Sequence, residues 1–218
     1  MIELYFAPGA CSIVPHVALE MVKAATGTPF EPKLVKLHKG EHKAPEYLAL
    51  NPNGQVPTLV VDGKPINQIV AILSYLDAAY PQAQLLPTAA MARAEAMSQL
   101  VWMNSTAHST FAHFFMPQAF AESDAGKAEV KALGAKHYRD CLERIQGWAA
   151  RGAPYLCGTQ FTPADVYAWT LLRWGGHAGI DPKSLPALNA YAERVAQVAP
   201  MAAAMERERI RMDTYKAA

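Results

Sequence analysis

The chain has 218 residues, of which 51% are hydrophobic and 18% charged, and its formal net charge is +1. This composition is typical of a globular protein with one or two domains, and the near-zero charge argues against a nucleic-acid partner, whose phosphates require a concentrated basic face. No apolar run reaches the roughly 18 to 20 residues of a membrane span, and the N-terminus lacks the basic start and long apolar stretch of a signal peptide.

The first 80 residues mix strand and helix signals. An apolar strand at 2–6 leads into the turn "APGACS", and apolar residues then recur at helical spacing over 13–25. The stretch 30–37 alternates like a half-buried strand, and 44–52 has the pattern of a short helix that Pro52 ends. These patterns predict a strand, a helix, a second strand and a short helix, in that order.

A hairpin and a helix follow. Asp62 and Gly63 form a strong hairpin signal between two short strands within 58–66. The stretch 67–80 has the pattern of an amphipathic helix, for which we expect Asn67 to be the N-cap. The whole segment is therefore expected to fold as one small α/β domain.

Helical patterns fill the chain from about residue 88 onward, and no strand candidate appears there. The Ala-, Leu- and Met-rich helical stretches lie at 88–120, 125–151, 163–178 and 186–209. Between the two parts, 80–90 carries two prolines and has the composition of a linker. We therefore predict an α/β domain over 1–80, a linker over 81–87 and an all-α domain over 88–218.

The cysteines are few and odd in number: Cys11, Cys141 and Cys157. Such a set suits a reducing compartment better than a disulfide framework. The chain also lacks a CxxC motif and the paired Cys and His spacing that holds structural zinc. We therefore expect a cytoplasmic protein without a metal.

The element order and five motifs resemble those of a known family. A βαβ unit followed by a ββα unit, with Pro57 heading the third strand, resembles the thioredoxin-like plan, and the attached helical domain resembles the cytosolic glutathione transferases. The similarity runs along nearly the whole chain and is densest at "YFAPGACSIVPHVAL", "EYLALNPNGQVPTL", "NSTAHSTF", "CGTQFTPADVYAWTLLRW" and "LPALNAYAERV". The PGACS turn and the surroundings of His108 are most similar to the bacterial beta class.

This resemblance implies a homodimeric enzyme that joins the thiolate of glutathione to small electrophiles. Through Cys11 it would also allow reduction of disulfide or peroxide substrates. Two other classes stay open: a catalytically weak or chaperone-like binding protein of the same fold, and a structural partner within an assembly. No metal is implied, and glutathione is expected as the co-substrate.

Four residues are candidates for activating the thiol. Cys11 and Ser12 lie at the mouth of a helix, where unpaired N–H groups favour an anion and lower a thiol pKa. By resemblance, beta-class enzymes place a cysteine here and a histidine at the position of His108, where it could deprotonate a thiol. Tyr5 occupies the position of the catalytic tyrosine of other classes, and Ser12 is the serine alternative. Cys11 could instead pack under the helix, and His108 could lie at an interface.

The resemblance also implies a glutathione-binding set. In this family the Val56–Pro57 bond is cis, which turns the backbone groups of Val56 toward the ligand, and a cis X–Pro bond costs only about 0.5–1 kcal/mol. The loop around Lys39 and His42 could offer cations to the glycyl carboxylate, or could be a solvated loop. The implied set comprises Ala10, Cys11, Lys39, His42, Gln55, Val56, Pro57, Gln68, Ile69 and His108.

One pair of this set departs from the family pattern. The family usually has Glu-Ser or Asp-Ser where this chain has Gln68 and Ile69. Losing the charge and the hydroxyl would weaken glutathione binding by about one to three orders of magnitude unless backbone groups or the Lys39 loop compensate.

The second domain offers two further predictions. Thr162 and Asp165 form a capping-box pattern with Pro163 at the first helical position, which indicates a structural role for Asp165. By resemblance, Phe111 and Trp174 are candidates for the acceptor pocket, although Trp174 could equally fill the core.

Overall fold

The computed structural model describes residues 1–213, and its N-terminal part is built on a four-stranded sheet. The strand order is β2-β1-β3-β4; β1 and β2 are parallel and the other pairs antiparallel. In β1 every second side chain is buried, and Leu4 is paired with Leu59 of β3, so that one face of the sheet forms a core. The strands are β1 (Ile2–Phe6), β2 (Glu31–Leu34), β3 (Thr58–Val61) and β4 (Lys64–Asn67).

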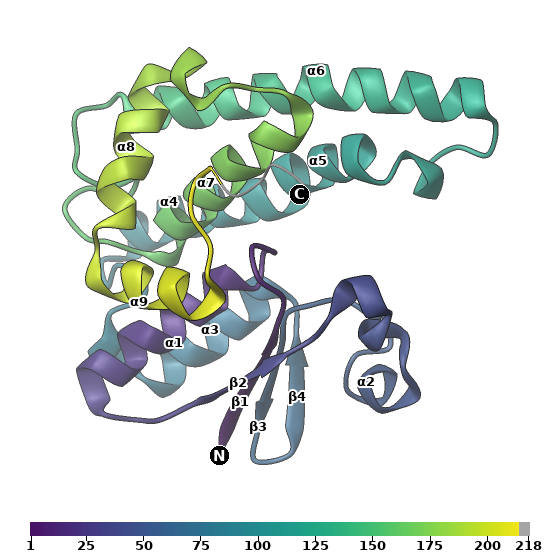
Figure 1. Cartoon of the computed structure of the whole chain (residues 1–218). Helices are drawn as coiled ribbons and strands as arrows, with labels where there is room; N and C mark the ends of the chain where they lie inside the picture. Colours follow the sequence, from purple (N-terminus) through teal and green to yellow (C-terminus); the bar gives the residue numbers. More distant parts are fainter. Residues whose placement is uncertain (214–218) are drawn as a thin grey trace.

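Two helices cover one face of the sheet. The helices α1 (Ile13–Thr26) and α3 (Ile69–Ala79) pack against each other and against the strands, as Figure 1 shows. The short helix α2 (Pro45–Leu50) lies to one side and ends before Pro52, as the sequence predicts. The thioredoxin-like βαβ and ββα order is therefore confirmed.

The start of α3 differs from the prediction. Asn67 is the last residue of β4, and its side chain accepts a hydrogen bond from the Thr58 hydroxyl at 2.8 Å and donates one to the Leu50 carbonyl at 3.1 Å. The N-cap residue is Gln68, whose φ is +75° and whose side chain makes no capping bond. The expectation of Asn67 as N-cap is wrong because its side-chain amide is hydrogen-bonded to Thr58 of β3 and to the Leu50 carbonyl.

The second part of the described chain is helical, and two expected helices are divided. The stretch 88–120 is interrupted by a π-helical turn at Met103–Ala107, and 186–209 breaks at Val198, which is extended ahead of Pro200. Apart from isolated bridges near Tyr155, no strand occurs between residues 88 and 213. The helices are α4 (Ala90–Trp102), α5 (His108–Phe115), α6 (Asp124–Ala149), α7 (Pro163–Gly175), α8 (Pro186–Ala196) and α9 (Ala199–Glu208).

Helix α7 is the centre of the helical part, because every one of its residues is buried. Its predicted capping box is confirmed. The Asp165 carboxylate accepts hydrogen bonds from the backbone N–H of Thr162 at 2.6 Å, the backbone N–H of Leu156 at 2.8 Å and the Tyr191 hydroxyl. Asp165 therefore holds the start of α7, and burial raises the pKa of its carboxyl.

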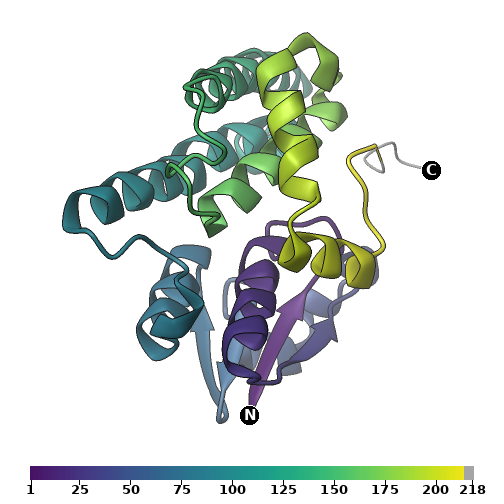
Figure 2. The same cartoon turned by 90° about the vertical axis from the view of Figure 1, so that its left-hand side faces the viewer.

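The two parts meet along α1. Helices α7 and α9 pack on α1, so that the last helix of the chain lies against the first, as both views show (Figures 1 and 2). This packing brings the turn that precedes α1 up against α7 and α9. Over residues 1–213 no helix is both long and apolar enough to cross a membrane.

Candidate functional site

A cavity of about 780 Å³ opens between the α/β part and the helical part. A second cavity of about 60 Å³ adjoins it, because four residues line both: Cys11, Gln55, Val56 and His108. From the α/β part come the turn before α1, the loop at 42–43 and the loop before β3. From the helical part come α5 and the end of α7. Segments far apart in the sequence thus share one site.

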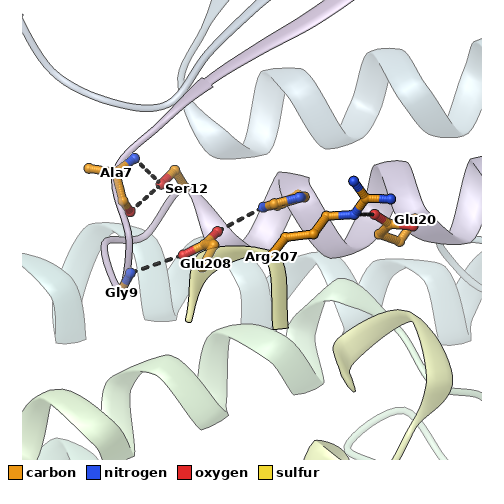
Figure 3. Close-up of polar contacts among 7 residues, drawn as sticks. Ala7, Gly9, Ser12, Glu20, Arg207 and Glu208 are labelled. Carbon is orange, nitrogen blue, oxygen red and sulfur yellow. Dashed lines mark hydrogen bonds and ion pairs between the residues drawn. The ribbon is translucent and has the colours of Figure 1, made fainter. Parts of the chain in front are cut away.

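The turn between β1 and α1 is held from the helical side. The Gly9 N–H donates to Glu208 Oε2 at 2.9 Å (Figure 3), and its carbonyl accepts from Trp174 Nε1 at 2.9 Å. Gly9 has φ +70°, and a Cβ there would lie 2.7 Å from an Arg173 nitrogen. The positive φ favours glycine at this position, and an added Cβ would also force the Arg173 guanidinium to move.

Two of the predicted catalytic residues do not reach the cavities. The Ser12 hydroxyl is buried; it donates to the Ala7 carbonyl and accepts from the Ala7 N–H, both at 3.1 Å (Figure 3). Tyr5 lies on β1 with its ring edge-on to Tyr47, the centroids 5.8 Å apart, and it lines neither cavity. Ser12 shapes the turn and Tyr5 packs beside the sheet.

Cys11 does lie at the junction of the two cavities, but its thiol is not activated. Sγ donates a hydrogen bond to the Val56 carbonyl at 3.5 Å. Burial, with a smaller contribution from the negative charge of Glu208, raises the pKa of the thiol to about 12. The expected lowering by the helix N-terminus is wrong, because loss of solvation outweighs the helix field at this depth. The predicted cis Val56–Pro57 bond is confirmed.

His108 lines both cavities from the first turn of α5. Its Nδ1 lies 2.7 Å from the Tyr167 hydroxyl, which in turn donates to Asn104 Oδ1 at 3.1 Å. The ring stands edge-on to Trp174 with the centroids 4.8 Å apart. Burial lowers the pKa of His108 to about 4, so the imidazole is neutral at pH 7.

The predicted glutathione-binding residues are brought together with two exceptions. Lys39 lines neither cavity, whereas its neighbour Lys43 lines the larger one. Ile69 lines the smaller cavity but is only 3% exposed and belongs to the hydrophobic core. The remaining members line one cavity or both: Ala10, Cys11, His42, Gln55, Val56, Pro57, Gln68 and His108.

The predicted acceptor residues form one aromatic wall. The rings of Phe111 and Trp174 stack with their centroids 4.8 Å apart and their planes 24° apart. Phe115 continues this wall, stacked on Phe111 at 5.3 Å, and His177 lies 5.7 Å from Phe115. Trp174 both lines the cavity and donates to Gly9, so the two alternatives for it are not exclusive.

Sequence reasoning missed the residues that act through others. Tyr167 contacts His108 59 positions away, Glu208 contacts Gly9 199 positions away, and Asn104 contacts Tyr167 63 positions away. Asn104 also lines the smaller cavity, one helical turn before His108. Only that spacing could have been read from the sequence, because it places Asn104 and His108 on one face of a helix.

Comparisons with known proteins agree with this geometry. The family model described as "Glutathione S-transferase, N-terminal domain" matches residues 2–78, and the one described as "Glutathione S-transferase, C-terminal domain" matches 103–198. A glutathione S-transferase of Xanthomonas campestris is 34% identical over 207 residues, which are 94% of this chain and 98% of that protein.

Solved structures give the same result. A glutathione transferase homologue from Sulfitobacter, with bound glutathione, superposes with a TM-score of 0.88 at 28% identity and covers 96% of this chain and 99% of its own. The bacterial beta-class glutathione S-transferase of Sphingomonas chungbukensis has a TM-score of 0.80 at 32% identity, with 94% and 98% covered. The likeness thus extends over both parts of the chain.

Proposed function

Since the chain belongs to the glutathione S-transferase family, we propose that it joins the thiol of glutathione to small, flat, apolar electrophiles in the cavity between its two parts. The observation that carries this proposal is the meeting of two unlike walls at one point. Polar and backbone groups around Gln55, Val56 and Gln68 form one wall, and the stacked rings of Phe111 and Trp174 form the other. Cys11 and His108 lie where the walls meet.

His108 is the proposed base. Neutral at pH 7, its imidazole takes the proton from the glutathione thiol: the S–H bond breaks, an N–H bond forms, and the electron pair stays on sulfur. The negative thiolate and the new imidazolium stabilise each other by charge attraction. The sulfur then forms a bond to carbon of the electrophile, the leaving group departs with its electron pair, and His108 returns its proton to water.

Cys11 has a different proposed role. Because burial raises its pKa to about 12, the thiol keeps its proton and can turn from the Val56 carbonyl to donate a hydrogen bond to the glutathione sulfur. A protonated thiol is a poor nucleophile, so this protonation state favours conjugation over disulfide or peroxide reduction through Cys11.

The glutathione itself is proposed to lie along the smaller cavity. The cis Val56–Pro57 segment would meet its cysteinyl backbone, and Lys43 with His42 would meet its glycyl carboxylate at the mouth of the larger cavity. The uncharged Gln68 side chain would face the γ-glutamyl end, and the Ile69 side chain packs in the hydrophobic core. These two positions support a second candidate, a member of the family that binds glutathione weakly and turns over slowly.

The experiment is a titration of the protein with glutathione by calorimetry, followed by conjugation kinetics with chlorodinitrobenzene as an aromatic probe. His108→Asn should lower kcat by about a hundredfold or more. The matched control is His113→Asn, because His113 lies on the same helix and bonds the Ser109 carbonyl outside both cavities. Absence of saturable glutathione binding, or equal losses in both variants, would overturn the proposal; binding without turnover would favour the second candidate.

A further inference from the structure

A chain of three hydrogen-bonded polar side chains begins and ends at the smaller cavity and passes through the buried helix α7 between. It starts at Asn104, passes through the Tyr167 hydroxyl and ends at Nδ1 of His108. Asn104 belongs to the π-helical turn Met103–Ala107, and His108 follows that turn directly, so both side chains lie on one face. Tyr167 comes from the fully buried helix α7. Such π-helical turns occur often at functional sites.

The order of donors along this chain sets where the imidazole proton lies. Asn104 Oδ1 can only accept, so the single hydroxyl proton of Tyr167 points to Asn104 at 3.1 Å. The Tyr167 oxygen must then accept from His108, and the 2.7 Å contact requires the proton on Nδ1. A neutral imidazole with Nδ1 protonated has a bare Nε2.

The bare nitrogen is the one that a ligand can meet. Within residues 1–213, Nε2 of His108 makes no hydrogen bond, and the His108 side chain lines both cavities. The edge-on contact with Trp174 limits rotation of the ring. Burial keeps the pKa of Tyr167 well above its usual value, so this hydroxyl keeps its proton over the whole working pH range.

We propose that Tyr167 and Asn104 are positioning residues that hold His108 in the tautomer with unprotonated Nε2, aimed at the glutathione sulfur. The inference rests on the proposed function, because it specifies how His108 accepts the thiol proton. The thiol S–H bond breaks and the new N–H bond forms at Nε2. Throughout, Nδ1 keeps its own proton, which stays hydrogen-bonded to the Tyr167 oxygen. A free imidazole favours the other tautomer, so without the chain most His108 side chains would present N–H where a lone pair is needed.

The tautomer is tested first, by ¹⁵N spectroscopy of the histidine-labelled whole protein without any substrate. His108 should show one protonated nitrogen at Nδ1 and one bare nitrogen at Nε2, assigned against the His108→Asn variant. A protonated Nε2 in the unaltered protein overturns the inference outright. This readout does not need glutathione, so it stands or falls apart from the proposed function.

Kinetics then test the consequence. Tyr167→Phe removes only the hydroxyl and should lower kcat with chlorodinitrobenzene about five- to tenfold, with the KM for glutathione changed by less than about twofold. The matched control is Tyr138→Phe, because the buried Tyr138 hydroxyl donates to the Leu171 carbonyl at 2.6 Å and has no part in the hydrogen-bond chain to His108. Equal kcat in the two variants would mean that the Tyr167 hydroxyl only supports the fold.

A double variant separates positioning from packing. In a His108→Asn background, Tyr167→Phe should have no further effect on kcat, because the residue acts only through His108. An undiminished loss in that background overturns the inference. If Tyr167→Phe does not fold, Asn104→Leu is the second variant: it frees the Tyr167 proton to turn toward Nδ1, and the ¹⁵N spectrum should show a protonated Nε2. An unchanged spectrum in that variant also overturns it.

Discussion

At the junction of the cavities, burial decides the protonation of both titratable side chains. It raises the pKa of Cys11 to about 12 and lowers that of His108 to about 4, so neither carries a charge at pH 7. Both shifts have the same cause, since desolvation disfavours whichever form is charged. A charge enters this junction only when a substrate brings one, and the neutral imidazole is then free to accept a proton.

The shift at His108 predicts a loss of stability in acid. The pKa of His108 is lower in the folded chain than its value of 6.5 in the unfolded chain. As the pH falls from 6.5 to about 4, the unfolded chain therefore binds a proton at His108 and the folded chain does not, which favours unfolding. The free energy of unfolding should fall by about 2 kcal/mol from this group between pH 7 and pH 4.5. Urea unfolding at both pH values, compared with His108→Asn, measures it.

The variant should lose about that much less stability than the unaltered protein over the same interval. A parallel pH dependence in the two proteins would mean that His108 is solvated or already charged in the folded state, and it would remove the argument for a neutral imidazole.

The Gln68 position predicts a gain of affinity. Gln68 is exposed at the smaller cavity and has no capping role, so Gln68→Glu restores a charge for the glutathione ammonium without disturbing the core. Glutathione binding should tighten about tenfold, as a recovered charge-assisted bond implies. Calorimetric titration measures it; unchanged affinity would show that the γ-glutamyl end lies elsewhere.

Ile69→Ser is the contrasting variant. Ile69 is buried among core residues, so the added hydroxyl should cost about 2–4 kcal/mol of unfolding free energy. We expect no compensating gain in affinity. Restoring both residues of the family pattern together would therefore combine a gain in glutathione affinity with a loss of stability. The two residues have to be changed separately.

At the scale of elements, α9 is joined to α1 and to the turn that precedes α1. The buried Glu208 carboxylate contacts His16 Nδ1 of α1 at 2.8 Å and the Gly9 N–H at 2.9 Å, and Arg207 pairs with Glu20 of α1 at 2.7 Å (Figure 3). Because a buried charge without partners is costly, this arrangement specifies how α9 docks. The turn that carries Cys11 is thus held by the last helix of the chain.

Truncating Glu208 tests this docking. Glu208→Leu leaves the His16 Nδ1–H and the Gly9 N–H without an acceptor and should lower the free energy of unfolding by about 3–5 kcal/mol. Glu208→Gln keeps an oxygen for Gly9 and should cost only about 1 kcal/mol. Chemical denaturation measures both; similar losses would mean that shape, rather than hydrogen bonding, holds α9.

At the scale of the whole molecule, the site exists only because two domains of the fold face each other across one cavity. The α/β part contributes Cys11, Gln55 and Val56 to the cavity, and the helical part contributes His108 and the aromatic wall. The same helical part leaves three apolar side chains more than two-fifths exposed: Phe120, which lines neither cavity, and Phe115 and Met116, which lie at the rim of the larger one. Exposed apolar groups gathered on one segment indicate a surface that a partner covers.

We predict that this partner is a second copy of the chain in a two-fold symmetric dimer. Phe115, Met116 and Phe120 expose apolar surface that a monomer leaves in water, and the resemblance to the cytosolic glutathione transferases implies a homodimer. Sedimentation at micromolar concentration should give about twice the chain mass of 23.7 kDa. A single species at the mass of one chain would refute it.

The sequence by itself determined the parts whose physics is local. The element order, the turn before α1 and the cap at Thr162 and Asp165 follow from short-range backbone preferences, and the resemblance to the family implied the cis bond at Pro57. These signals also carried the family, which the comparisons confirm. The candidate residues Cys11 and His108 came from the same motifs, and both lie at the cavity junction. The domain boundaries at 80 and 88 stay a prediction.

The tertiary structure alone decided what those residues can do. The motif placed Cys11 at a helix N-terminus, but burial of its side chain raises the thiol pKa. The motif also placed Ser12 beside Cys11, but the Ser12 hydroxyl is hydrogen-bonded to the backbone of Ala7. The partner of Gly9 lies 199 positions away at Glu208, and the partner of His108 lies 59 away at Tyr167. Solvation and hydrogen-bond direction depend on which segments pack together, and no local pattern encodes that packing.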